Sequence, residues 1–421
     1  MRPARTENPL KHSHISDARA EMMPVYAWRP DQQVRAADGR PIYRGEIEWS
    51  SGKQRPSRFE LLPSLIDGDL VDRLRGAADE LPFDERPDSV DGSPAHELYV
   101  IKDGATKHKT LAEWVQPALS TLRGLTMSWP ICQRAGCWPC TALIRRYRPD
   151  ERRAHYEHVD GHAAATAVIS LSRAAAYQGG LFLSNLTSRT LLTLGAGDAV
   201  VHASDLFHGV DVSDGERWSL VVWFRTCARC TMAGSGEWYR QRAEAGEPFA
   251  SFLHASRASQ ALSSVRQRHA NAALWYNRSA HGGFAPAMHA LGNAFAAGEG
   301  VAADLRLATA WLESAVASGS GDLLSGIGGA GRPGGPSVGS RAAFDLAKLL
   351  LRGVEMGWPS PMGGGGEPGE RAAELLEMAA ADGHVRAREA LGLAEVDSAL
   401  NSGGGGETGP LSPAWLRARC V

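Results

Sequence analysis

Three histidines and two acidic residues lie within the segment HYEHVDGH (155–162), in a chain that has only fourteen histidines. In a β-strand the side chains of residues i and i+2 point to the same face. We therefore expect His158 and Asp160 to reach one metal ion together, whereas His155 should lie on the opposite face. The strand is expected to end before His162. An HxD pair alone is a weak indication, because such a pair recurs by chance.

Two residues further along the chain complete a stronger pattern. His208 follows Asp160 by forty-eight residues, and Arg217 comes nine residues later, at the start of the apolar run WSLVVWF. A His, a carboxylate and a second His on one side of an ion form the facial triad of non-haem Fe(II) oxygenases, which leaves coordination positions open. These positions suit the keto-acid end of 2-oxoglutarate and dioxygen. The far carboxylate of 2-oxoglutarate needs a fixed, fork-shaped cation, and Arg217 supplies that geometry better than a lysine would.

Short apolar or alternating runs, divided by Gly, Asp and Ser, fill the region from Ala142 to Phe224. The runs are ALIRRY, AHYEHVD, TAVISLS, GGLFLS, TLLTL, DAVVHA, LFHGVDV and RWSLVVWF. Eight short strands at such close spacing predict a β-sandwich or barrel. Two helices are expected before them, one beginning near residues 67–69 and one over 110–125, where Pro117 marks a kink or a boundary.

The HVD step, the two glycines at 179–180 and GDAVVHASDLFHGVDVSDGERWSLVVWF resemble the catalytic domain of the prolyl 4-hydroxylase-like Fe(II)/2-oxoglutarate-dependent dioxygenases. The resemblance covers about residues 140–226. It implies an α+β domain with a double-stranded β-helix, or jelly roll, and flanking helices. It also implies iron bound by His158, Asp160 and His208, 2-oxoglutarate bound by Arg217, and ascorbate as the reductant.

The same resemblance implies roles for two further cofactor-binding residues. Tyr147, in RRYRPDE, occupies the place of a Tyr near the cosubstrate or substrate, although a Tyr on a barrel strand is usually a packing residue. Ser170 stands where some peptidyl hydroxylases have a Tyr that bonds the cosubstrate carboxylate. Either Thr166 or Ser170 would then replace that contact.

The chain after Cys230 becomes helical and alanine-rich, and it repeats. FAPAMHALGNAFAAGEGVAADLRLATAWLESAVASG (284–319) has the form of two helices joined by a Gly-rich turn, and the form returns over 341–353 and 370–383. These units resemble Sel1-like repeats, relatives of the tetratricopeptide repeat that stack into an all-α solenoid. The resemblance implies a surface that binds a protein partner. A solenoid that only buttresses the catalytic domain is the alternative.

Two CxxC steps stand near the two ends of the strand-rich region. Cys137 and Cys140 precede it, and Cys227 and Cys230 follow it. In the fold implied by the resemblance, the first and last strands lie side by side, which would bring Cys140 close to Cys227. The four thiols could then bind a structural Zn. Free buried thiols, or a redox-labile Cys137–Cys140 pair, are the alternatives.

Composition narrows the choice of partner and compartment. The formal net charge of −2 gives no electrostatic reason to expect nucleic acid, and no apolar run is long enough to span a bilayer, so neither partner is expected. Six cysteines in 421 residues are too few for a disulfide scaffold. Because the first residues also lack the apolar core of a secretory signal, we expect a cytoplasmic location.

The sequence thus predicts five segments and one main function. The segments are a disordered or loosely packed arm (1–57), a dioxygenase domain (58–230, core 140–226), a helical linker (231–269), a Sel1-like domain with Gly-rich inserts (270–400) and a tail (401–421). The expected function is hydroxylation of a peptidyl proline or lysine in a partner protein. The alternative is a non-catalytic repeat adaptor that carries a degenerate oxygenase fold.

Overall fold

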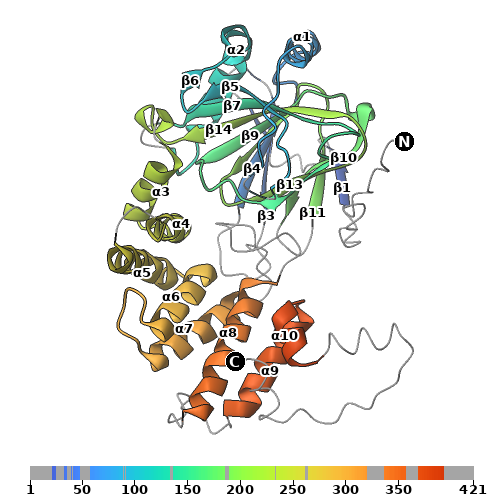
Figure 1. Cartoon of the computed structure of the whole chain (residues 1–421). Coiled ribbons are helices and arrows are strands. Elements are labelled where there is room, and N and C mark those ends of the chain that lie inside the picture. The colour runs from blue at the N-terminus through green and yellow to red at the C-terminus, as the bar shows by residue number, and fades with distance from the viewer. Residues whose placement is uncertain are drawn as a thin grey trace, which may run out of the picture.

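The computed structural model has a β-rich part, partly covered by two helices, and a helical part that follows it in the chain (Figure 1). It describes residues 21–24, 33–35, 39, 41–47, 57–88, 90, 92–132, 136–184, 189–232, 234–260, 264–319, 336–356 and 368–392. The predicted tail and most of both Gly-rich inserts lie outside these residues. Antiparallel sheets combined with several helices agree with the predicted α+β class.

Eight consecutive strands form the centre of the β-rich part, and they are the eight that the sequence predicts. In one sheet the order is β11 (Arg189–Thr193), β10 (Tyr177–Ser184), β13 (Phe207–Gly215) and β8 (Ala154–His158). In the other it is β12 (Ala199–Ala203), β9 (Ala165–Ser170), β14 (Arg217–Arg225) and β7 (Trp138–Tyr147). All these pairings are antiparallel. Two such facing sheets form a jelly-roll core.

In strand β9, alternate residues face the outside and the inside of the barrel. Ala165, Ala167 and Ile169 belong to the hydrophobic cluster on the outer face, whereas Val168 belongs to the cluster between the sheets. Thr166 and Ser170 share the inner face with Val168, because strand side chains alternate. The inner face of this strand therefore brings two hydroxyl groups into the barrel.

Helices α1 (Gly68–Asp79) and α2 (Lys109–Thr126) pack against the outer cluster. Asp67 caps α1, since its Oδ1 accepts a hydrogen bond of 2.7 Å from the Leu70 amide. Both helices occur where they were predicted. Helix α2 continues through Pro117, so this residue is not the boundary that was considered.

Further strands enlarge both sheets. They are β1 (Glu21–Pro24), β2 (Gln33–Arg35), β3 (Pro41–Ile47), β4 (Ser57–Leu62), β5 (Glu97–Lys102) and β6 (Ala105–Thr106). Strand β1 pairs with β11 in parallel, and β3 pairs with β4, with Ile42 only 3% exposed. All described residues of the 1–57 segment except Gly39 therefore belong to the sheets, in contrast to the expected loose arm. The sequence did not predict them because β1 and β2 have only four and three residues, and β3 (PIYRGEI) lacks a regular alternation of apolar and polar residues.

The helical part is a series in which each helix packs against the next one in the chain. Its members are α3 (Ser235–Glu244), α4 (Pro248–Ala258), α5 (Val265–His281), α6 (Ala285–Ala297), α7 (Leu305–Gly319), α8 (Val338–Glu355), α9 (Pro368–Ala381) and α10 (Val385–Ala390). One hydrophobic cluster runs from α4 to α10. Among the described helices, none is both long and apolar enough to cross a membrane.

Two glycines show why small residues recur in these helices. Gly298 ends α6 with a φ of 71°, a left-handed conformation that favours glycine. A Cβ at Gly292 would lie 2.8 Å from Leu312 Cγ, so this position allows α6 and α7 to approach closely. The Sel1-like repeat itself stays a prediction, because the packing alone does not identify the family.

Candidate metal centre and substrate cleft

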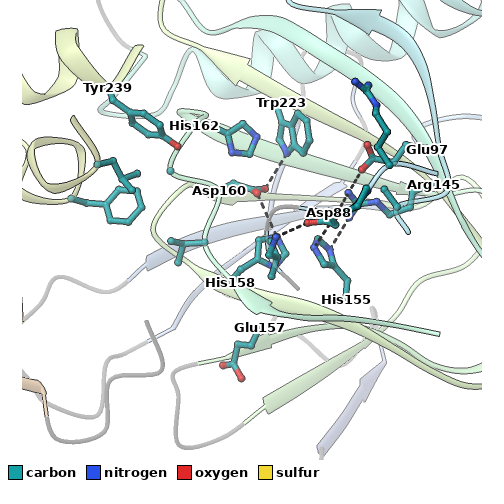
Figure 2. Close-up of a pocket in the computed structure, with 18 of the residues that line it drawn as sticks. Asp88, Glu97, Arg145, His155, Glu157, His158, Asp160, His162, Trp223 and Tyr239 are labelled. Carbon is teal, nitrogen blue, oxygen red and sulfur yellow. Dashed lines mark hydrogen bonds and ion pairs between the residues drawn. The ribbon is translucent and has the colours of Figure 1, made fainter. Parts of the chain in front are cut away.

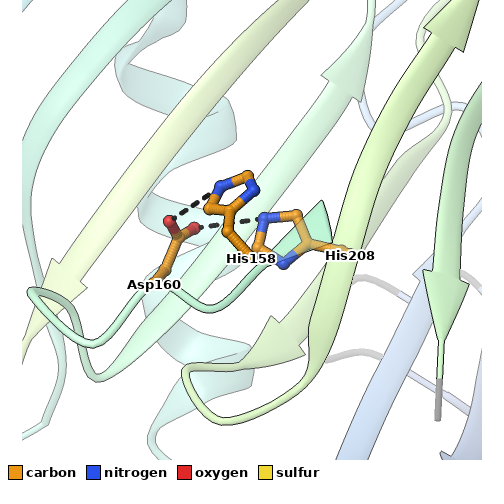
Figure 3. A group of neighbouring side chains, drawn as sticks. All are labelled: His158, Asp160 and His208. Carbon is orange, nitrogen blue, oxygen red and sulfur yellow. Dashed lines mark ion pairs between the residues drawn. The ribbon is translucent and has the colours of Figure 1, made fainter. Parts of the chain in front are cut away.

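His158, Asp160 and His208 meet at one end of the barrel (Figure 3). His158 ends β8, and Asp160 follows two residues later. His208 lies on β13, where it pairs with His158 on the neighbouring strand β8. One ligand atom from each residue lies within 4.8 Å of the others. The Nε2 atoms of His158 and His208 are 3.6 and 3.5 Å from the two Asp160 oxygens. The structure thus brings together the three residues predicted to bind iron.

The two imidazoles are held by main-chain carbonyl groups. Nδ1 of His158 is 2.7 Å from the Tyr156 oxygen, and Nδ1 of His208 is 3.1 Å from the Leu206 oxygen. Because a carbonyl oxygen only accepts hydrogen bonds, each Nδ1 must carry the proton. Nε2 of each ring then faces Asp160, and it is the nitrogen that can bind a metal ion. Such outer partners fix the tautomer and orientation of metal-binding histidines.

Asp160 is buried, with 3% of its surface exposed, and two side chains donate to its Oδ2. Thr166 Oγ1 donates at 2.6 Å and Trp223 Nε1 at 3.1 Å. Burial alone would raise the pKa of Asp160, but the imidazoles of His208 and His158 outweigh it and hold the pKa well below its usual range. Thr166 was a candidate for the cosubstrate contact, and the structure instead directs its hydroxyl to Asp160.

His155 lies beside the triad, and its expected position on the opposite face is wrong. Its ring centroid is 4.2 Å from that of His158, and its side chain is buried. The reason is a register shift: His158 pairs with His208, whereas His155 pairs with Val210, so three steps on β8 match two on β13. The extra residue of this β-bulge returns His155 to the inner face.

His155 belongs to a buried network of charged groups that lines the cleft (Figure 2). Arg145 Nη1 donates to His155 Nδ1 at 2.7 Å, and Asp88 Oδ2 is 3.4 Å from His155 Nε2. Arg145 also forms an ion pair with Glu97, and Arg152 forms one with Asp88 at 3.0 Å. No sequence pattern predicts this network, because its members come from two separate segments, 88–97 and 145–155.

Arg217 lies within the barrel with only 1% of its surface exposed. Its Nη1 donates to Ser219 Oγ at 3.3 Å. Among the residues that the structure describes, neither Nε nor Nη2 of Arg217 has a hydrogen-bond partner. A buried guanidinium with unused donors is costly unless an anion binds to it. Its donors therefore fit the far carboxylate of 2-oxoglutarate.

Two tyrosines flank this guanidinium. The Arg217 Cζ atom is 5.8 Å from the ring centroid of Tyr147 and 5.9 Å from that of Tyr177. Tyr147 was predicted near the cosubstrate, while Tyr177 was missed because it precedes the Gly–Gly pair without a motif of its own. The predicted residue Ser170 is fully buried, and its hydroxyl donates to the Ser172 carbonyl oxygen at 2.9 Å. Its role toward the cosubstrate stays a prediction.

A cleft of about 690 Å³ opens beside the triad, and both parts of the molecule line it. His158 and Asp160 reach it from the barrel, next to Trp223 and His162. The opposite wall is formed by α3, α4 and the turn after α4, through Tyr239, Phe249, Leu253, Ser256, Arg257 and Gln260. The Tyr239 hydroxyl points toward His162 and Asp160 (Figure 2), and burial raises its pKa to about 12, so it stays protonated at neutral pH.

The cysteines do not form the predicted zinc site. Cys132 is bonded to Cys137 and Cys227 to Cys230, while Cys140 is free and buried. The Cys137–Cys140 redox pair is therefore also wrong. Strands β7 and β14 do lie side by side as expected, but the Cys140 thiol donates to the Trp223 carbonyl oxygen at 3.1 Å. Disulfides remove one basis of the cytoplasmic expectation, which stays a prediction.

Comparisons with known proteins return only distant likenesses. No family model matches the sequence, and no curated protein is significantly similar to it. A 2OG-Fe(II) oxygenase family oxidoreductase from Burkholderia pseudomallei is 19% identical over 40% of this chain and 84% of its own, with a TM-score of 0.32. A Pseudomonas putida prolyl-4-hydroxylase is 22% identical over 40% of this chain and 91% of its own (TM-score 0.28). A Sel1 repeat protein from Oxalobacter formigenes is 23% identical over 38% of this chain and 53% of its own (TM-score 0.28).

Proposed function

We propose that this protein is an Fe(II)- and 2-oxoglutarate-dependent dioxygenase that hydroxylates a proline or lysine side chain of a partner protein. The observation that carries the proposal is that the Nε2 atoms of two imidazoles lie 3.6 and 3.5 Å from the oxygens of one carboxylate, with one ligand atom of each residue within 4.8 Å of the others. This donor set is the one that non-haem Fe(II) oxygenases use. The iron supplies the activation of dioxygen.

The residues of this chain divide the remaining tasks among them. His158, Asp160 and His208 hold the metal, and the carbonyl groups behind the imidazoles keep them in the binding tautomer. Arg217 binds the far carboxylate of 2-oxoglutarate through its unused donors. This position suits a cosubstrate that stays inside the barrel, since Arg217 begins β14 and Trp223, six residues later, lines the cleft.

The substrate enters through the cleft between the barrel and α3–α4. Its walls combine charged groups from the 84–99 segment with Tyr239, Phe249 and Leu253 from the helical part. A mixed wall of this kind suits a peptide, whose main chain needs hydrogen-bond partners and whose side chains need apolar contacts. The Sel1-like helices would then bind the same partner protein at a second place, which raises the effective concentration of the target residue.

The test is aerobic incubation of a cell lysate with the protein, Fe(II), 2-oxoglutarate and ascorbate. We expect succinate release, together with peptides that gain one oxygen atom in mass spectrometry. The matched control is His158→Ala, which should abolish both signals. Normal partner binding without succinate release from any peptide pool would instead favour the non-catalytic adaptor.

A further inference from the structure

The turn that carries Asp160 is contacted by the helical part of the molecule. Trp238, on α3, donates from Nε1 to the carbonyl oxygen of Gly161 at 3.1 Å. Phe249, on α4, packs against the same residue so tightly that a Cβ at Gly161 would lie 1.7 Å from the Phe249 Cε1 atom. Gly161 is the residue that directly follows the carboxylate of the triad. The helical part therefore reaches the metal-binding residues through their own main chain.

These two contacts connect the turn to two different cores. Trp238 is 1% exposed and belongs to the hydrophobic cluster on the outer face of the barrel sheet. Phe249 packs against the cluster that runs from α4 to α10. Arg225 also holds the turn, because its Nε donates to the His162 carbonyl oxygen at 3.3 Å, and its Cζ atom lies 5.6 Å from the Trp238 ring centroid. The position of Asp160 thus depends on packing in both parts.

We propose that Trp238 and Phe249 are positioning residues that hold the Asp160–His162 turn and thereby set the metal affinity of the triad. This inference rests on the proposed function, because it takes the triad to be a metal site. The physical reason is that a metal ligand must be held to within about 0.5 Å, and its supporting contacts decide whether it is. Loss of such supporting contacts typically lowers metal affinity by about 10- to 100-fold.

The first test removes the indole donor and keeps an aromatic ring. In full-length Trp238→Phe we expect Co(II) to bind roughly fivefold or more weakly, the effect of one lost hydrogen bond, and its visible absorption spectrum to change. The matched control is Trp275→Phe, because Trp275 lies on α5 and its ring contacts are with His254 and Arg278. Thermal melting of both variants reports whether the fold is retained.

The second test uses the tight contact itself. Gly161→Ala should displace the turn and weaken Co(II) binding about tenfold or more, because the new methyl group meets Phe249. Phe249→Ala alone should weaken Co(II) binding less than Gly161→Ala does, because the turn loses one support. Adding Phe249→Ala to Gly161→Ala should restore the affinity to the level of Phe249→Ala alone, since it removes the ring that the methyl group meets. Such a rescue shows coupling between the two residues, which general destabilisation would not produce.

The outcomes separate this inference from the proposed function. Unchanged Co(II) affinity and spectrum in Trp238→Phe, or no rescue of Gly161→Ala by Phe249→Ala, would overturn the positioning role while leaving the metal site in place. Wild-type protein that binds neither Co(II) nor Fe(II) at the triad would overturn both.

Discussion

The two ends of the barrel interior differ in how many of their polar atoms already have partners. At the triad, both Nδ1 atoms face carbonyl oxygens and Asp160 Oδ2 accepts from Thr166 and Trp223. At the other end, two of the guanidinium nitrogens of Arg217 have no partner among the described residues. The first end is organised by the protein before any ion binds. The second is a buried charge whose partners must arrive with the ligand.

This difference predicts two different responses to mutation. Side chains around the triad support one another, so a change there should reach the metal through the contacts that orient its ligands. Among the described residues Arg217 donates only to Ser219, so its replacement should weaken 2-oxoglutarate binding and leave metal binding unchanged. Separate measurements of metal affinity and of 2-oxoglutarate affinity in variants of the two ends therefore test this difference.

The largest effect is expected from His208→Ala. Removing a ligand should weaken Fe(II) or Co(II) binding more than about 100-fold, because loss of a residue that only hydrogen-bonds to a ligand already lowers metal affinity about 10- to 100-fold. Titration of the metal-free protein with Co(II) measures this. His254→Ala is the matched control, because His254 packs against Trp275 on α5. Retention of near-normal metal affinity in His208→Ala would remove His208 from the triad.

Arg217→Ala tests the other end. We expect the dissociation constant of 2-oxoglutarate to rise roughly 10- to 100-fold, since a buried hydrogen bond to a charged group contributes about 1.5–3 kcal/mol. The dissociation constant of Arg217→Lys should lie between those of Arg217→Ala and wild type, because lysine keeps the charge but lacks the paired donors of the guanidinium. Calorimetric titration of the metal-loaded protein with 2-oxoglutarate gives both values. A parallel loss of metal affinity would contradict the separation of the two ends.

The strands and the triad could be predicted because they depend on local alternation and on residue types at fixed spacing. His158 and Asp160 share a face by the two-residue period, and the apolar run after Arg217 marks a buried strand. The same rule misplaced His155, because the bulge in β8 depends on its register with β13. A register shift of this kind is a property of two strands, so one strand's sequence does not reveal it.

Contacts between segments far apart in the chain are the second feature that could not be predicted from the sequence. Trp238 and Gly161 are seventy-seven residues apart, and nothing in either local sequence relates α3 to the metal-binding turn. The cysteine pairing failed for a related reason. CxxC spacing drew attention to Cys137 and Cys140, whereas the fold pairs Cys137 with Cys132, five residues earlier.

Thr166→Val examines the supporting contacts of the triad. The change keeps the shape of the side chain and removes the donor to Asp160 Oδ2, so we expect Co(II) affinity to fall about tenfold. Thr309→Val is the control, because Thr309 is also buried and its hydroxyl donates only within α7, to Leu305. Equal metal affinities in the two variants would mean that Trp223 alone orients the carboxylate.

The smallest effect is expected from Ser170→Ala, and it decides which groups near Arg217 are truly available to the cosubstrate. A carboxylate only accepts hydrogen bonds, and the one proton of Ser170 already goes to the Ser172 carbonyl oxygen. We therefore expect the dissociation constant of 2-oxoglutarate to change less than about twofold, while the free energy of unfolding falls by about 1 kcal/mol. Calorimetry and urea denaturation measure the two quantities. A tenfold loss of 2-oxoglutarate affinity would instead show that the hydroxyl turns to the ligand, and the Arg217 end would then be partly organised by the protein, as the triad is.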